Sequence, residues 1–432
     1  MNNNISFIND LSWRGMIHDS SVDIDTLFSN DMVSAYIGFD ATADSLHVGH
    51  LMQIMTLVHF QRAGHKPFVL VGGATSMVGD PTGKSQERSL LDIETLKHYQ
   101  GCLAEQLSKF MDFSPSNNQA EIINNYDWLK DYSFLNFIRD VGKHITVNYM
   151  MAKDCVKNRF SGDTGISFTE FCYQLVQGYD FYYLFNQRNC LLQMGGSDQW
   201  GNITTGIELI RRKTGKKAYG ITTKLIKKAD GTKFGKTEGG SVWLDRNKTS
   251  PYSFYQFWLN AADQDAISWI KYFTLKSKEE IEGIINRHMS DPGKRLLQKE
   301  LANELTTTVH SKEDANKSAA AAEFLFGNTT TEFINSLSDT EVEEMFYSNN
   351  IFTLSKDDLS EPLNIINLIV DKTEIIKSRS EARRLISQQG VLLNKAKVLD
   401  DTYNLGDKDL LNGKYLIIQK GKKNYFLIRF VS

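Results

Sequence analysis

The sequence has few cysteines, no long apolar run and no leader-like start. No cysteine lies in a CxxC motif or at metal-ligand spacing; the four are Cys102, Cys155, Cys172 and Cys190. No stretch of 18 apolar residues occurs, and residues 1–10 lack a basic segment followed by an apolar one. We therefore expect a cytoplasmic protein with reduced thiols, no membrane span and no structural metal site.

Two common nucleotide-binding motifs are also missing. The loop Gly72–Ser85 resembles a phosphate loop, but the position six before Lys84 is Val78 where a Walker A motif needs glycine. Pro81 also removes a backbone donor from that loop. The turn Gly195–Gly201 lacks the GxGxxG pattern of dinucleotide-binding enzymes. A P-loop NTPase and a typical dinucleotide-binding enzyme are both disfavoured.

The net charge of −3 is small but unevenly distributed over the 432 residues. Residues 365–432 contain 13 Lys and Arg against 7 Asp and Glu, which leaves 36 against 45 for the rest of the chain. Such a basic segment is typical of contact with a polyanion. With 41% apolar and 23% charged residues, the composition is that of a globular protein with room for two or three domains.

The first half of the chain alternates strand-like and helix-like segments. Residues 33–39 mix β-branched and aromatic types and predict a buried strand, and apolar residues at helical spacing predict a helix from Ser45. Further strands are predicted at 67–71, 120–124 and 190–194, with helices at 91–110, 127–141, 169–185 and 201–213. This alternation predicts an α/β fold, with a Rossmann-like, doubly wound parallel sheet.

The second half is expected to be helical and then α+β. An acidic, polar stretch suits a linker, and Ser378 with Glu381 predicts a capped helix followed by a strand and a basic hairpin. We predict four parts: a Rossmann-like catalytic domain (1–225), a lysine loop with a helical domain (226–330), a linker (331–361) and a small RNA-binding α+β domain (362–432).

The stretch His47–His50 lies where a strand, a loop and a helix start are predicted to meet. Free N–H groups at a helix start favour phosphate, and Gly49 leaves room for a flat ring. A helix start with two exposed histidines explains this tetrapeptide equally well. A second candidate set, Tyr173, Gln177 and Asp180, shares one face of a predicted helix and suits a polar small molecule. Taken alone, the wet face of an amphipathic helix explains these three better.

Basic side chains form two further candidate sites. Lys233 and Lys236 lie in a glycine-bracketed loop and are able to reach a triphosphate. Taken alone, a hairpin at Asp230 and Gly231 with solvated lysines explains them better. Arg379, Arg383 and Arg384 cluster on the predicted C-terminal helix, which suits RNA phosphates.

Together these stretches resemble the class I aminoacyl-tRNA synthetases, and among them the tyrosyl-tRNA synthetases of bacterial type. His47–His50 is similar to the HIGH signature, Lys233–Thr237 to the KMSKS signature, and residues 378–398 to an S4-type RNA-binding module. The sequence departs from the family pattern at Ala41, Val48, Phe234, Gly235 and Thr237. Because both signature lysines are kept, we expect these changes to affect loop dynamics more than chemistry.

The resemblance implies activation of L-tyrosine by ATP with Mg²⁺, transfer to tRNA(Tyr), and a homodimer with its interface around residues 130–165. The implied catalytic residues are His47, His50, Lys233, Lys236, Lys84, Arg88 and Thr42. The implied tyrosine contacts are Tyr36, Asp80, Tyr173, Gln177 and Asp180, of which Tyr36 and Asp180 bind the phenol. The implied ATP contacts are Gly38, Asp40, His47, Gly49, His50, Gly196, Asp198, Gln199 and Lys236. The implied tRNA contacts are Arg379, Arg383, Arg384, Lys395 and Lys397.

Three other classes share parts of this pattern. A tryptophanyl-tRNA synthetase has both signatures, but the Tyr36/Asp180 pair and the C-terminal module disfavour it. A small HxGH nucleotidyltransferase needs neither the lysine loop nor the RNA-binding tail. A synthetase-like RNA-binding protein without catalysis would have no use for the intact histidines and lysines.

Overall fold

The computed structural model describes residues 6–29, 32–82, 91–153, 156–157, 165–237, 240–327, 331–346, 350–359, 362–421 and 424–431. They fall into two compact units: Met1–Thr249 with Trp258–His310, and Ser250–Phe257 with Ser311–Ser432. Among the helices of the described residues, none is both long and apolar enough to cross a membrane. The four-part division of the chain stays a prediction.

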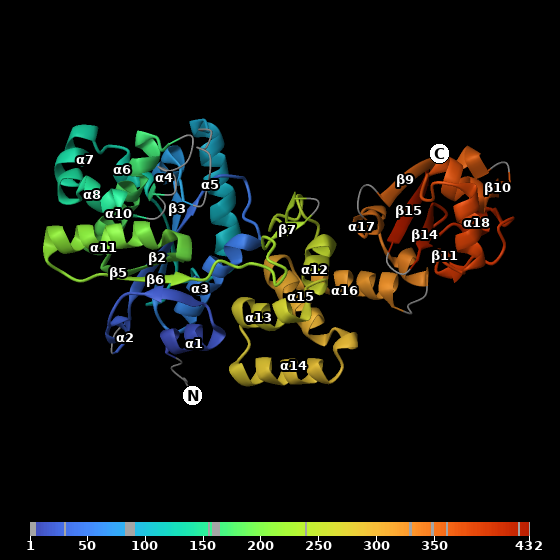
Figure 1. Ribbon diagram of the computed structural model, residues 1–432, viewed down its shortest axis with the longest axis horizontal. Helices are drawn as coiled ribbons and strands as arrows, with labels where there is room; N and C mark the ends of the chain where they lie inside the picture. The colour runs from blue at the N-terminus through green and yellow to red at the C-terminus, as the bar shows by residue number, and fades with distance from the viewer. Residues whose placement is uncertain are drawn as a thin grey trace. The chain divides into compact units, whose positions relative to one another are not determined.

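The first unit is built on a six-stranded sheet with the order β1-β6-β5-β2-β3-β4 (Figure 1). Its strands are β1 (Ile17–Ser20), β2 (Ser34–Asp40), β3 (Lys66–Gly72), β4 (Glu121–Asn124), β5 (Cys190–Gly196) and β6 (Tyr219–Thr223). All pair in parallel except β1, which is antiparallel to β6. The strand order reverses between β2 and β5, and ligands of open α/β sheets bind beyond the carboxyl ends at such a point. The predicted α/β fold class is confirmed.

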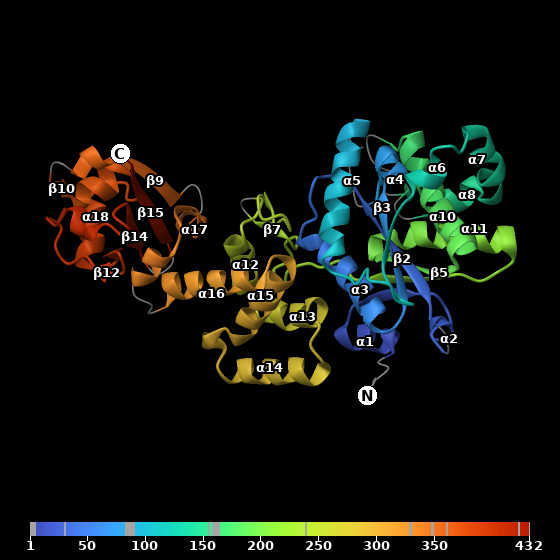
Figure 2. The same ribbon diagram turned by 180° about the vertical axis from the view of Figure 1, so that it is seen from behind.

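Helices cover this sheet and extend beyond it. Those among and around the strands are α1 (Phe7–Arg14), α2 (Ile24–Leu27), α3 (Leu51–Arg62), α4 (Ala74–Val78), α5 (Ile93–Ser108), α6 (Tyr126–Leu129), α7 (Phe134–Asp140), α8 (Val147–Met151), α10 (Phe168–Arg188) and α11 (Trp200–Thr214). α3 and α5 pack beside β3, and α10 and α11 pack on β5 (Figures 1 and 2). A short hairpin, β7 (Lys236–Thr237) and β8 (Gly240–Ser241), precedes α12 (Pro251–Leu259), α13 (Asp263–Phe273), α14 (Lys278–Ser290) and α15 (Leu296–Val309).

One predicted helix begins later than its sequence pattern indicates. The helix expected from Ser45 starts at Leu51, after a single 3-10 turn over Val48–His50. The Val48 N–H donates to the Val242 carbonyl (2.9 Å), which keeps the chain before it extended. The Ser45 hydroxyl is buried and donates to the Leu46 carbonyl (2.8 Å), so it does not cap the helix. A tertiary strand-like pairing has displaced the local helix start.

Two other differences have local causes. The pattern of residues 127–141 predicts one helix, but the chain forms α6 and α7, because the Ser133 hydroxyl caps a new start at the Asn136 N–H (3.3 Å). Strand β1 was not predicted; it is an edge strand with mostly exposed side chains and therefore has no hydrophobic pattern.

The second unit contains the basic C-terminal segment. Its helices and turns are α16 (Lys312–Phe326), η5 (Thr331–Ser336), α17 (Asp339–Glu344), η7 (Lys356–Leu359), the π-helix η8 (Asn367–Lys372) and α18 (Arg379–Ser387). Its strands are β9 (Ile351–Ser355), β10 (Leu363–Asn364), β11 (Val391–Leu393), β12 (Ala396–Lys397), β13 (Asn404–Leu405), β14 (Tyr415–Lys420) and β15 (Asn424–Val431). The main sheet has the order β12-β11-β14-β15-β9. Strand β9 pairs in parallel with β15, so part of the segment indicated as a linker belongs to this sheet.

Candidate active site

The first part of the site lies between strand β2 and helix α10. Tyr36 on β2 is buried, and its ring meets Phe181 of α10 edge to face at 5.7 Å. Asp180, the neighbour of Phe181, is also buried. Burial, and then the charge of Asp180, raise the pKa of Tyr36 well above its usual value. Within the part of the chain that the structure describes, the Tyr36 hydroxyl has no hydrogen-bond partner. A buried hydroxyl in this state is suited to bonding a ligand hydroxyl.

Two residues that the sequence did not single out hold Asp180. The Asn125 side-chain amide donates to one carboxylate oxygen (2.9 Å), and the Trp128 indole donates to the other (2.8 Å). Burial nevertheless raises the pKa of Asp180 to about 7, against the effect of these two hydrogen bonds. Asn125 is itself fixed, because its side-chain oxygen accepts from the backbone N–H groups of Gly73 and Ala74 (2.8 Å each). No local pattern marks either residue, so sequence reasoning had no signal for them.

Carboxylates gather at the other end of the candidate site. The Tyr173 hydroxyl donates to Asp40 (2.9 Å), and the Gln199 amide donates to Asp80 (2.7 Å). Burial, and then the charges of Asp40 and Asp80, raise the pKa of Tyr173 well above its usual value. This end therefore carries negative potential and suits an ammonium group.

Two more predicted residues border this end. The side-chain oxygen of Gln177 accepts from the Asn202 amide (2.9 Å), which orients it. Burial, and then the charge of Asp80, raise the pKa of Asp198. A Cβ at Gly196 would lie 2.5 Å from an Asp198 oxygen, so a larger residue there would displace the Asp198 side chain. Gly38 has no such constraint within the protein, since its nearest neighbour would lie 3.7 Å away.

The two histidines form a compact turn. The His47 N–H donates to Nδ1 of His50 (3.1 Å), and the Gly49 N–H donates to Nδ1 of His47 (3.0 Å). The two ring centroids are 4.1 Å apart. A Cβ at Gly49 would lie 2.6 Å from the His47 ring, so a larger residue there would displace this ring. Burial, and then the charge of Lys236, lower the pKa of His47. The structure thus brings Lys236 within electrostatic reach of the histidines.

The lysine loop is tied to the histidine turn by its backbone. The Val48 N–H donates to the Val242 carbonyl (2.9 Å), and the Leu244 N–H donates to the Leu46 carbonyl (2.8 Å). Gly235 adopts a left-handed φ of 76°, and a Cβ there would lie 2.7 Å from the Val48 side chain. The departure to glycine at this position therefore permits close contact between the two signature segments.

At position 234 the sequence departs from the KMSKS pattern with a phenylalanine, whose ring anchors the lysine loop. Phe234 packs edge-on against Trp269 at 4.9 Å and stacks on Phe273 at 5.6 Å, and Trp258 lies 5.9 Å away. All three partners are buried. Lys236 is exposed, and its ammonium donates to the Ser241 hydroxyl (2.8 Å). An anchored aromatic residue thus precedes a lysine whose side chain remains accessible to solvent.

The remaining predicted residues are placed as follows. Thr42 is exposed after β2, and Lys233 is exposed in the lysine loop. Lys84 and Arg88 lie outside the described residues. Among the described residues, no group of three or more His, Cys, Asp and Glu side chains is arranged to hold a metal ion.

Several basic residues of the C-terminal module have acidic or polar partners. On α18, Arg379 pairs with Asp371 (2.5 Å) and Arg383 with Asp401 (3.1 Å), while Arg384 is exposed. In the β11–β12 hairpin, Lys397 is exposed and donates to Gln389 (2.7 Å), and Lys395 donates to backbone carbonyls of α16.

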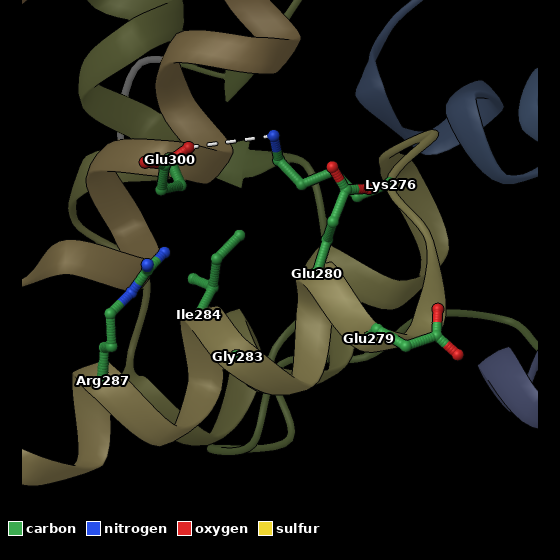
Figure 3. A pocket seen from close by; sticks show the side chains of 7 residues that line it. All are labelled: Lys276, Glu279, Glu280, Gly283, Ile284, Arg287 and Glu300. Atoms are coloured by element: carbon green, nitrogen blue, oxygen red, sulfur yellow. Dashed lines mark ion pairs between the residues drawn. The ribbon is translucent and has the colours of Figure 1, made fainter.

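A separate pocket of about 380 Å³ lies on the helical part of the first unit (Figure 3). Its lining comprises Lys276, Glu279, Glu280, Gly283, Ile284, Arg287 and Glu300. Lys276 pairs with Glu300 (3.9 Å) and Glu304 (3.0 Å), and Glu280 caps the start of α14. These groups already serve the helical fold, and none of them is a predicted site residue.

Comparison with known proteins gives consistent matches. Residues 29–327 match the family model of class I tRNA synthetases (W and Y), and residues 341–428 match a tyrosine–tRNA ligase SYY-like C-terminal domain. The tyrosine–tRNA ligase of Bacteroides fragilis is 53% identical over 427 residues, which are 98% of this chain and 99% of that protein. That of Flavobacterium johnsoniae is 51% identical over 430 residues, 99% of this chain and 100% of that protein.

A solved structure is similar over most of the chain. The C-terminally truncated mitochondrial tyrosyl-tRNA synthetase of Aspergillus nidulans is 32% identical with a TM-score of 0.68. The match covers 74% of this chain and 94% of that one.

Proposed function

The chain belongs to the tyrosine–tRNA ligases, a family of class I aminoacyl-tRNA synthetases, and on this premise we propose how its residues share the reaction. The enzyme activates L-tyrosine with ATP and transfers it to the terminal adenosine of tRNA(Tyr). The buried Tyr36 hydroxyl beside Asp180 is the observation that supports the tyrosine site best. ATP–pyrophosphate exchange measured with each amino acid tests the assignment: tyrosine should support it, and exchange with tryptophan instead would overturn it.

Tyr36 and Asp180 bind the substrate phenol, and the opposite end of the pocket binds the α-ammonium group. The unpartnered Tyr36 hydroxyl and the carboxylate of Asp180 supply a donor and an acceptor for one phenol. Asp80, Tyr173 and Gln177 receive the ammonium, for which the carboxylates at that end provide the charge. Phenylalanine would leave the two phenol-binding groups buried and unpaired.

Activation needs no nucleophile from the protein. A carboxylate oxygen of tyrosine attacks the α-phosphorus of ATP, the bond from that phosphorus to its bridging oxygen breaks, and pyrophosphate leaves with the electron pair. The protein contributes in-line positioning and stabilisation of charge. Mg²⁺ enters with ATP, since this ion prefers phosphate oxygens and retains several waters.

Two groups of residues serve the nucleotide. The phosphates are bound by His47, His50, Thr42, Lys233 and Lys236, with Lys84 and Arg88 assigned by the resemblance. The adenosine is surrounded by residues near the strand ends: Gly38, Asp40, Gly49, Gly196, Asp198 and Gln199. The support for this division is that the histidine turn contacts the lysine loop, while Asp40 and Asp80 accept hydrogen bonds from Tyr173 and Gln199.

The C-terminal module binds tRNA through its exposed basic side chains. Arg379, Arg383 and Arg384 lie on α18, and Lys397 lies in the adjacent hairpin. Their support is the exposure of these side chains together with the net positive charge of residues 365–432. A cytoplasmic location follows from a role in translation.

Tyrosine binding should depend on pH through Asp180. Beside the hydrogen bonds from Asn125 and Trp128, the ionised carboxylate accepts a hydrogen bond from the substrate phenol more strongly than the neutral acid does. Because the pKa of Asp180 is raised to about 7, the protonated form gains population as the pH falls. We expect the Kd for tyrosine, measured without ATP by fluorescence titration, to rise up to about tenfold per pH unit below 7. Asp180→Asn should bind weakly and without this dependence, and a flat profile for the unmodified protein would contradict the prediction.

A homodimer through α7 and α8 is also proposed. These short helices expose several apolar side chains: Phe134, Leu135, Ile138 and Val147. Leu135 is 78% exposed, which is costly unless a second copy covers it. The patch lies within residues 130–165, where the family resemblance places the interface.

Leu135→Glu should therefore dissociate the dimer. Each copy loses about 1.5–3 kcal/mol of apolar burial and symmetry doubles this, so the dimer Kd is expected to rise about a hundredfold or more. Sedimentation velocity over a concentration series measures the change. Val22→Glu is the matched control, because Val22 is 80% exposed but lies outside the patch. Unchanged sedimentation of Leu135→Glu would place the interface elsewhere or remove it.

A further inference from the structure

Lys395 lies in the turn between strands β11 and β12, and its side chain contacts the end of helix α16. Its ammonium donates to the carbonyls of Phe324 and Gly327 (2.8 Å to the latter), which end helix α16. The same ammonium lies 5.0 Å from the centre of the Phe324 ring. A cation at the carbonyl end of a helix is favourable on both hydrogen-bonding and dipole grounds. Lys395 therefore fastens the hairpin to α16.

The backbone of this turn has a conformation that is unfavourable for a lysine. Asn394 and Lys395 both have positive φ, 45° and 69°. Two-residue turns of this kind favour glycine at the second position, and a non-glycine residue there is strained. The contact between the Lys395 ammonium group and α16 offsets this strain. Glycine would remove the strain, but it would also remove the contact.

A second attachment runs through residues 331–346, which we name the bracket. Asp339 of α17 pairs with Lys414 and accepts from the hydroxyl of the buried Tyr415 (2.8 Å). Glu343, one turn later, pairs with Arg429 of β15 (2.8 Å). Two carboxylates of one short helix thus contact the adjacent ends of strands β14 and β15.

The bracket also reaches back to α16. Glu341 of α17 pairs with Lys317 of α16 (2.7 Å), and the Asn412 amide donates to the Ile334 carbonyl (3.0 Å). Val342 and Ile334 are fully buried, so the bracket is packed as well as paired. Each exposed ion pair is weak by itself, but several in one short segment act together.

We propose that Lys395 and the bracket fix the C-terminal sheet on α16, and that Lys395 supports tRNA binding by positioning the module rather than by touching RNA. This inference rests on the proposed tRNA-binding role of the module. It separates two lysines of one hairpin: Lys397 is exposed and meets phosphate, while Lys395 is committed to helix α16.

Salt dependence distinguishes the two roles. Each phosphate contact contributes about 0.7–0.9 to the slope of log K against log salt concentration. The full-length variants Lys395→Ala, Lys397→Ala and Arg384→Ala are titrated with a tRNA(Tyr) transcript at several salt concentrations. We expect Lys395→Ala to weaken tRNA binding about five- to tenfold with an unchanged slope. Lys397→Ala and Arg384→Ala should each lower the slope by about 0.7–0.9, the contribution of one phosphate contact. Tyrosine-dependent ATP–pyrophosphate exchange should stay unchanged in Lys395→Ala, which checks that this variant is folded.

Three outcomes would overturn the inference. A slope reduced in Lys395→Ala would make this lysine a phosphate contact. Unchanged affinity in Lys395→Ala, with weaker binding in the other two, would remove its positioning role and leave the proposed function standing. Unchanged affinity in all three would overturn the tRNA-binding role of the module and this inference with it.

A charge exchange tests the bracket even if Lys395→Ala folds poorly. Glu343→Arg places two like charges beside each other and should weaken tRNA binding about fivefold at an unchanged slope. Combining it with Arg429→Glu restores an opposite pair and should recover the affinity. Failure of the double variant to recover, with the single variant weakened, would show that the pair itself does not position the module.

Discussion

Lys236→Ala is expected to slow formation of tyrosyl-adenylate by about a hundred- to a thousandfold, the usual cost of removing one group that stabilises transition-state charge. The Kd for tyrosine should stay the same, because Lys236 acts on the phosphates and lies outside the amino-acid pocket. Its charge already reaches the histidine turn, where it contributes, after burial, to the lowered pKa of His47. Single-turnover measurement of adenylate formation, with tyrosine affinity measured separately, gives both quantities.

The variant should keep its fold, since the Lys236 side chain is exposed and donates to Ser241. Lys227→Ala is the matched control: it removes an exposed lysine from the same loop and should leave the rate within about twofold. A loss of tyrosine affinity equal to the loss of rate would contradict the assignment, because it would place Lys236 in ground-state binding.

Phe234 distinguishes the charge of the loop from its position. Phe234→Ala removes the ring that packs on Trp269 and Phe273 and should lower the rate through a less ordered loop, with both lysines intact. Phe234→Met restores an apolar side chain and should recover most of the rate. If alanine and methionine behaved alike, the aromatic cluster would have no part in positioning the lysines.

Asp180→Ala should collapse discrimination between tyrosine and phenylalanine. The variant loses a hydrogen bond to the substrate phenol, and it also loses the penalty for burying an unpaired carboxylate against phenylalanine. Each effect is about 1–3 kcal/mol, so the ratio of kcat/KM values should narrow by about a hundredfold or more. ATP–pyrophosphate exchange with the two amino acids measures it. Intact discrimination in a folded Asp180→Ala protein would show that the phenol binds elsewhere.

Asn125 and Trp128 offer a graded test of the same site. Trp128→Phe keeps an aromatic ring but removes the donor to Asp180, so it should narrow discrimination less than Asp180→Ala does. Trp200→Phe, on the first turn of α11, provides a control for an equivalent substitution outside this contact.

Much of the fold follows from local pattern. Residues 33–39, 67–71 and 190–194 carry runs of apolar and β-branched side chains, and strands β2, β3 and β5 form there with small shifts at their ends. The glycine turns after these strands and the helical spacing of α10 and α11 are equally local. Such signals survive in a single sequence because burial on one face or both imposes a period on neighbouring residues.

Local sequence patterns predict only part of the candidate site. Tyr173, Gln177 and Asp180 are predicted to share a face because they lie on one helix, and each hydrogen-bonds to a residue far away in the sequence. Asn125 and Trp128 could not be found, because they contact Asp180 across 55 and 52 positions of sequence. The resemblance to a family supplied the pairing of the two signature segments, which no local pattern indicates.

By itself, then, the sequence determined the α/β order, the basic C-terminal module and the chemical types of the groups proposed to bind tyrosine and ATP. Tertiary structure decided where the helix after His47 begins, which residues hold Asp180, and that Lys395 fastens α16 while Lys397 is exposed. The reason is physical: spacing along the chain specifies which side chains share one helix or strand face. Hydrogen bonds between distant segments exist only once packing has brought their donors and acceptors to within about 3 Å.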